Sequence, residues 1–267
     1  MAEMLRANLL ANLVCYRRSR LLLAFMLVAL LLTGLSALPA IFTDSGVQSF
    51  NALQSIFSDL NQFLLFFSAG LGLFIISSHV RSRSLKMVFT KPCPPSLWLG
   101  SAFLSAVIVS LLLNCMVLSS AVVLSLKWHI PVCPGLIFVS LDTFMASVGV
   151  IAYLMLLASL MHPAIAATFA LIFNADLFYS AQVWTLGAIR SGNSSLVLRA
   201  LEKLFHLLYL VLPMVHAFGN KTESIYSSLR VLHSEWKYIF FALGYAMALS
   251  AFCYSLALFA LQRKRYT

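Results

Sequence analysis

The sequence predicts an all-α, polytopic membrane protein with six transmembrane helices, an N-terminal amphipathic surface helix and short external helices between the fifth and sixth spans. Composition is the first observation: 61% of the 267 residues are hydrophobic and 10% are charged, with a mean hydropathy of +0.94. A soluble domain is about 45–50% apolar and about 25% charged. The second observation is that Lys and Arg lie between the long apolar segments and not in their cores. Together they exclude a soluble globular domain, a disordered chain and a secreted disulfide scaffold.

Residues 1–20 are predicted to form a helix on the cytoplasmic membrane surface. Leu5, Leu9 and Leu13 recur every four residues on one side, and Arg6 and Arg17 take the other side. A basic amphipathic helix of this kind binds the lipid–water interface, so membrane lipid is an expected partner. The alternative interpretation is a positively charged flank of the first span.

Six segments are long enough to span a bilayer, which takes about 20 apolar residues as a helix. They are residues 21–42, 61–80, 97–126, 135–161, 163–184 and 238–261. The first resembles a signal peptide, because residues 37–40 read Ala-Leu-Pro-Ala. Its apolar run is longer than the roughly 7–15 residues of a signal core, so we expect a retained helix.

The basic residues predict the orientation of the chain. With a cytoplasmic N-terminus, the inner segments hold eleven bases and one acid, a net charge of +10. The outer segments then hold seven bases and five acids, a net charge of +2. We therefore expect a multi-pass protein of the cell (inner, or cytoplasmic) membrane with both termini in the cytoplasm, and no nucleic-acid partner.

Residues 185–237 are predicted to form an external re-entrant or interfacial cap. Within an apolar stretch, Arg199, Glu202, Lys203 and His206 recur at helical spacing and form one polar stripe. A charge at the bilayer centre costs about 2.5–3.5 kcal/mol on the insertion scale. An interfacial helix avoids that cost, so it is favoured over a seventh span.

No pattern in the chain predicts a catalytic residue, a metal site or a cofactor site. The motifs GxxxxGK[ST], HExxH and GxSxG are absent, and the five cysteines and six histidines lack ligand spacing. Asp142 and Asp176 are the only charged residues within the predicted spans. Intramembrane acids are candidate functional residues, and both a structural role at the interface and a place in a translocation path remain open.

Residues 81–97 are predicted to form a short cytoplasmic helix between the second and third spans. Leu85, Val88 and Phe89 share one face, Lys86 points elsewhere, and the run breaks at a Lys-Pro pair. An apolar helix face held between two spans is suited to docking in a groove of another protein. The alternative is an ordinary basic loop that only fixes the orientation.

This layout resembles the permease subunits of ATP-binding-cassette (ABC) type-2 transporters. Residues 90–100, TKPCPPSLWLG, are similar to the family's "lysine or threonine, proline, small, aromatic, glycine" passage into the third span. Residues 208–220, LYLVLPMVHAFGN, are similar to its leucine-rich, Leu-Pro, then Phe passage before the last span. Many members have acids at the start of the coupling helix, where this chain has His79, Arg81 and Arg83.

The resemblance implies a transport subunit that is not itself an enzyme. Residues 1–267 would form one permease domain that pairs with a second permease copy, as in a homodimer. A separate ABC ATPase subunit would bind ATP and drive movement of a substrate, usually outward. Alternatives are a non-enzymatic anchoring or assembly subunit of a membrane complex and a membrane-embedded enzyme acting on lipid-linked substrates. Residues 81–97 would be the coupling helix, and the implied ATPase-coupling residues are Leu85, Lys86, Val88, Phe89, Lys91 and Pro92.

Overall fold

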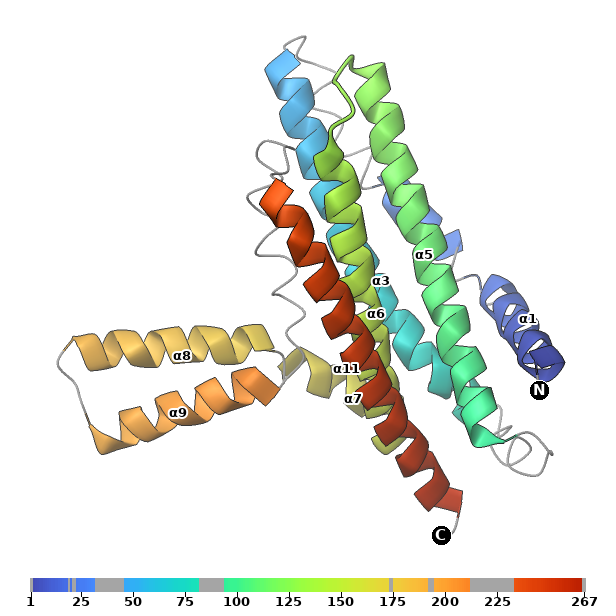
Figure 1. The fold of residues 1–267 in the computed structure, drawn as a ribbon, viewed down its shortest axis with the longest axis vertical. Helices are drawn as coiled ribbons and strands as arrows, with labels where there is room; N and C mark the ends of the chain where they lie inside the picture. The colour runs from blue at the N-terminus through green and yellow to red at the C-terminus, as the bar shows by residue number, and fades with distance from the viewer. Residues whose placement is uncertain are drawn as a thin grey trace.

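Four long apolar helices form the body of the molecule. The computed structural model describes residues 2–18, 20, 23–31, 46–81, 94–172, 175–191, 195–211 and 233–265, and their regular structure is entirely helical. The helices long and apolar enough to cross a membrane are α3 (Gly46–Arg81), α5 (Pro95–Lys127), α6 (Pro134–Leu160) and α11 (His233–Arg265). They run alongside one another as an elongated bundle (Figure 1). They coincide with the predicted second, third, fourth and sixth spans.

The central helix of the bundle is α6, which packs against α3, α5 and α11. In an apolar stretch of 18 residues of α6, 67% of the residues are buried, compared with 22% to 44% in the equivalent stretches of the other three helices. Small residues allow this close packing. A Cβ added at Gly72 of α3 would lie 2.8 Å from the carbonyl oxygen of Ile151, so the two backbones are nearly in contact.

The surface of α5 has the pattern of a helix in lipid. Its buried face is rich in small and hydroxyl side chains, whereas large apolar side chains point outward. Two of the buried serines donate hydrogen bonds to carbonyls three residues earlier, Ser101 to Trp98 at 2.8 Å and Ser105 to Ala102 at 2.7 Å. Because a soluble helix has the opposite polarity, this distribution indicates a lipid-facing exterior. The outward residues include Leu104, Leu111, Leu112, Met116, Val123 and Leu126.

The helix α3 begins fifteen residues before the predicted start of the second span, at Gly46. Residues 46–60 contain polar side chains that lower the local hydropathy and conceal the helix from a search for continuous apolar runs. The buried positions Leu53, Ile56, Phe57 and Leu60 nevertheless recur at helical spacing. Amphipathic packing therefore extends the helix beyond the apolar core.

The predicted first and fifth spans are not among the four long helices. Of residues 21–42 the structure describes 23–31, which are helical. Phe25 there is buried, with ring centroids 5.2 Å from Phe63 and 5.0 Å from Phe67 of α3. The predicted fifth span is divided between α7 (Pro163–Ile172) and α8 (Ala175–Arg190). Asn174 and Asp176 lie at this division, and both residue types are poor helix formers.

The remaining helices are α1 (Ala2–Arg18), which falls within residues 1–20, and α9 (Leu196–Val211), which falls within residues 185–237. α1 packs on α5, and α9 pairs with α8 as a hairpin that projects sideways from the bundle (Figure 1). Gln182 and His206 join the hairpin through a side-chain hydrogen bond of 3.1 Å.

Each end of the bundle is formed by a particular set of helix ends. Both chain termini lie toward the end at which α3 finishes and α5 begins (Figure 1). The helices α6 and α11 run in the same direction and also finish at that end. Arg81 and Arg265 are the last residues of α3 and α11, so both of these helices end in a basic residue there.

Candidate functional site

The predicted site residues fall in three different places. Asp142 lies on α6 and is fully described. Asp176 is the second residue of α8, outside the four long helices, and its side chain is not among the described ones. The predicted coupling residues, Leu85, Lys86, Val88, Phe89, Lys91 and Pro92, lie outside the described residues, between Arg81 and Pro94.

Asp142 is a buried carboxyl at the interface of α6 and α11. Its side chain is 1% exposed. The hydroxyl of Tyr238 on α11 donates a hydrogen bond to this carboxyl. The second oxygen, Oδ1, is also buried, and no described residue donates a hydrogen bond to it. A carboxyl with one buried oxygen lacking a donor is costly to fold, which distinguishes Asp142 from an ordinary packing residue.

Close packing of α6 and α11 brings Asp142 opposite Tyr238. One turn along, Met145 and Ala146 of α6 pack with Ala242 and Ala246 of α11 in a small cluster. The alanines leave room for the two helix backbones to approach, as small residues do at membrane helix interfaces. This contact fixes the register that pairs the acid with the phenol.

Aromatic rings surround the same end of the α6–α11 interface. Phe138, one turn before Asp142, is completely buried. Its ring centroid lies 5.6 Å from that of Trp236 in an edge-to-face arrangement and 6.3 Å from that of Tyr238 in a stacked one. Trp236 and Tyr238 lie near the start of α11, so the rings separate Asp142 from that end of the bundle.

Asn114 and Ser140 form a reciprocal polar contact between α5 and α6 that the sequence analysis did not identify. The Asn114 Nδ2 donates to the Ser140 carbonyl at 3.0 Å, and the Ser140 hydroxyl donates to Asn114 Oδ1. Both side chains are 4% exposed. The sequence signal that could have identified Asn114 is a polar amide side chain within a predicted apolar span. The contact sits two residues from Asp142 on α6 and holds that part of α6 against α5.

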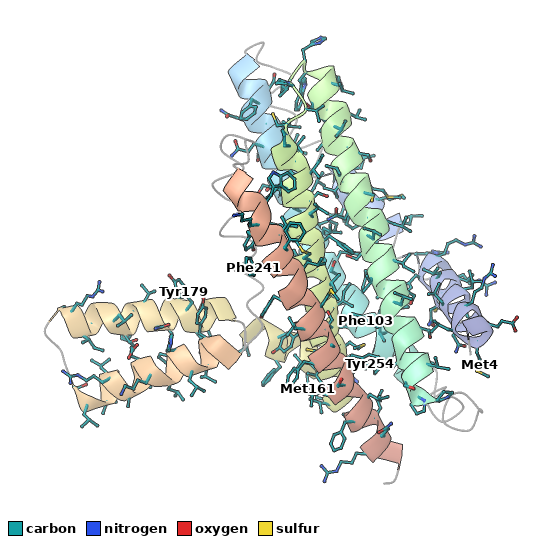
Figure 2. The ribbon with its side chains drawn as sticks, viewed as in Figure 1. Met4, Phe103, Met161, Tyr179, Phe241 and Tyr254 are labelled. Carbon is teal, nitrogen blue, oxygen red and sulfur yellow. The ribbon has the colours of Figure 1, made fainter. Side chains whose placement is uncertain are left out.

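A second polar contact joins α11 to the beginning of α5, at the C-terminal end of the predicted coupling segment 81–97. The Tyr254 hydroxyl donates to the Ser96 carbonyl at 2.7 Å. A Cβ added at Gly100 would lie 3.3 Å from this hydroxyl, so the glycine provides the space for the phenol. Figure 2 shows Tyr254 between α11 and α5, and Phe241, which is 78% exposed, on the outer side of α11.

The helix α1 is anchored by Tyr16, which is 3% exposed and packs against Phe74 of α3 with ring centroids 5.1 Å apart. Burial raises the pKa of the Tyr16 phenol, and the neighbouring Cys15 raises it further. Asn12 and Ser105 line a partly open hollow beside it with a volume of about 10 Å³. That volume corresponds to about one water molecule, so the hollow is no substrate site.

The described side chains include no group of three or more His, Cys, Asp or Glu that could hold a metal ion. Cys15, Cys115, Cys133 and Cys253 are free thiols. The polar site around Asp142 is therefore the strongest candidate in the described part of the chain.

Comparison with known proteins adds no identification. The chain matches no family model, no curated protein and no solved structure. What the fold defines is a membrane protein built around four long apolar helices.

Proposed function

We propose that the chain is the membrane-spanning permease subunit of an ABC exporter, which moves a substrate with energy from a separate ATPase subunit. The observation that carries the proposal is that particular helix ends lie together at one end of the bundle. The end of α3, the beginning of α5 and both chain termini lie at the same end of the bundle (Figure 1). In the sequence, the segment between the two helices contains the bases Arg83, Lys86 and Lys91. Bases gather on the cytoplasmic side of membrane proteins, so this segment would face a cytoplasmic ATPase.

The directions of the helices support six spans. Both the N-terminus and the end of α3 lie at the basic end, whereas α3 begins at the opposite end (Figure 1). The chain between Arg18 and Gly46, which includes the helical residues 23–31, therefore joins the two ends once. Because α6 and α11 are parallel, the chain between Leu160 and His233 must do the same. Within this proposal, these two crossings and the four long helices would give six spans, with both termini in the cytoplasm.

Within this proposal the coupling helix is the mechanical input. Closure of the ATPase dimer would push on residues 81–97 and so on the adjoining ends of α3 and α5. The contact of Tyr254 with Ser96 would carry that movement from α5 to α11. Asp142 and Asp176 would lie along the translocation path, and the chain would contribute no catalytic residue and bind no ATP itself.

The first experiment tests the partner. The tagged chain is extracted from its host in mild detergent, and the proteins that co-purify are identified. We expect an ABC ATPase in near-equal amount, together with a second copy of the chain. A chain that purifies without ATPase, in a detergent that keeps a known ABC transporter intact, would refute the proposal. Co-purification with a non-ATPase partner would instead indicate an anchoring subunit.

A variant pair then tests the coupling segment. Replacing Leu85, Val88 and Phe89 by aspartate removes the apolar face that would dock on the ATPase, so the ATPase should be lost from the preparation. The matched control is Leu196→Asp, because Leu196 is an 85% exposed leucine on α9, away from the segment. Equal recovery of ATPase with both variants would contradict the assignment of residues 81–97.

A further inference from the structure

The α6–α11 interface contains a carboxyl that its packing does not require. Asp142 is 1% exposed and its Oδ1 has no donor among the described residues. An apolar pair of similar shape would hold the two helices together without this desolvation cost. An acid kept at such a position inside a membrane protein points to an interaction beyond folding.

No basic side chain of the described residues neutralises Asp142. The carboxyl forms no ion pair there, and its one hydrogen bond comes from the neutral phenol of Tyr238. Among the described residues, the acceptor capacity of Oδ1 is therefore free for a donor or a positive charge.

The groups beside Asp142 are the ones that bind organic cations. The rings of Phe138, Trp236 and Tyr238 lie with centroids 5.6 and 6.3 Å apart in two pairs that share Phe138. Aromatic faces attract ammonium and related cations, and the attraction grows when water is excluded. A carboxylate adds a full opposite charge to the same site. An anion would be repelled by the same carboxylate and by the negative faces of the rings.

From these observations we propose that Asp142, Phe138, Trp236 and Tyr238 bind the positively charged head of a lipophilic organic cation. This inference rests on the proposed transport function and names the class of its substrate. Phe240 and Phe241, next to Tyr238 on α11, are 75% and 78% exposed and offer an apolar surface for the rest of such a molecule.

The site is closed in this conformation, because Phe138 and Asp142 are both buried. Access requires the first turns of α11 to move away from α6, which would carry Trp236 and Tyr238 off the carboxyl. The alanine contact at Ala242 and Ala246 is the next point along the interface and would act as the pivot. The cation would then take the place of the Tyr238 hydroxyl beside the carboxyl.

The test measures binding by the purified full-length chain in phosphatidylcholine nanodiscs without an ATPase. The probe is tetraphenylphosphonium, and tetraphenylborate has the same shape and the opposite charge. We expect saturable binding of the phosphonium, and at least tenfold weaker binding in Asp142→Asn. Asp59→Asn is the matched control, because it makes the same change on α3 and should leave binding unaltered.

Two further variants keep the result decisive if Asp142→Asn does not fold. Phe138→Leu and Trp236→Leu keep the carboxyl, and each removes one ring, so binding should weaken about 2- to 30-fold in either variant. The inference would be overturned by lipid partitioning alone with the wild-type chain, by equal binding of tetraphenylborate, or by unchanged binding in Asp142→Asn, Phe138→Leu or Trp236→Leu. No ATPase is present in this assay, so failure to bind the phosphonium would not refute the permease proposal. Conversely, a chain that purifies without an ATPase could still bind the phosphonium at this site.

Discussion

Replacing Gly72 by alanine should destabilise the contact between α3 and α6. The new Cβ would lie 2.8 Å from the carbonyl oxygen of Ile151, 3.1 Å from its Cα and 3.1 Å from Cβ of Leu154. Two of these atoms belong to the backbone of a packed helix and cannot rotate away. The two helices must therefore separate by several tenths of an ångström along a well-packed interface.

The magnitude follows from two opposing contributions. Overpacking a well-packed core costs about 1–3 kcal/mol. Alanine in place of glycine inside a helix contributes about 1 kcal/mol of stability. We therefore expect Gly72→Ala to lower the free energy of unfolding by about 0–2 kcal/mol. Gly70→Ala is the matched control, because a Cβ at that position of the same helix meets no atom within 4 Å.

The comparison of the two alanine variants cancels the helix-propensity contribution. Gly70→Ala should raise the free energy of unfolding by up to about 1 kcal/mol. Gly72→Ala should therefore be about 1–3 kcal/mol less stable than Gly70→Ala. The assay is unfolding by sodium dodecyl sulfate in mixed micelles, followed by circular dichroism. If Gly72→Ala were as stable as Gly70→Ala, the close approach of α3 and α6 would be wrong.

Three further predictions concern polar contacts. The first is a double-mutant cycle with Asn114→Ala and Ser140→Ala, measured by the same unfolding assay. The two substitutions should show a coupling free energy of about 0.6–1.7 kcal/mol, the average to the maximum for interhelical hydrogen bonds in membranes. If their effects on the free energy of unfolding were strictly additive, the contact would be excluded. Tyr254→Phe removes the hydrogen bond to Ser96 and should lower the unfolding free energy by about 0.5–1.5 kcal/mol, whereas unchanged stability would place the phenol away from α5. Burial raises the pKa of the Tyr16 phenol above its ordinary value of 10.0, so its contribution to stability is complete below pH 10 and declines as the pH rises further. Stability measured across that alkaline range should fall less steeply in Tyr16→Phe than in the wild type, and parallel curves would count against a buried Tyr16.

The class of membrane protein could be predicted from the sequence because it depends on the number and length of apolar segments. Runs of apolar residues long enough to cross a bilayer predicted α5 and α6 to within two residues at each end. The same criterion missed the beginning of α3, because Leu53 and Ile56 lie among polar residues there. The average hydropathy of that stretch conceals a buried helical face. It also treated residues 163–184 as one continuous span, whereas the structure divides them between α7 and α8.

The candidate site was only half predictable. Asp142 is visible in the sequence as an acid within an apolar run, because charge is rare in such segments. Its partner is 96 positions away on another helix, and a tyrosine near the end of a span is common at membrane interfaces. Nothing in the sequence pairs Tyr238 with Asp142, or Asn114 with Ser140, because these pairs depend on which helices are neighbours.

The sequence by itself determined a basic, helical chain of membrane-protein character. These properties follow from composition and spacing, which each segment carries independently of the others. Only the tertiary structure decided that α6 is the central helix, and that its acid meets a phenol of α11 beside a group of aromatic rings from both helices. The physical reason is that helix neighbours and their register are set by close packing, where a single absent Cβ, as at Gly72, decides whether two backbones can meet.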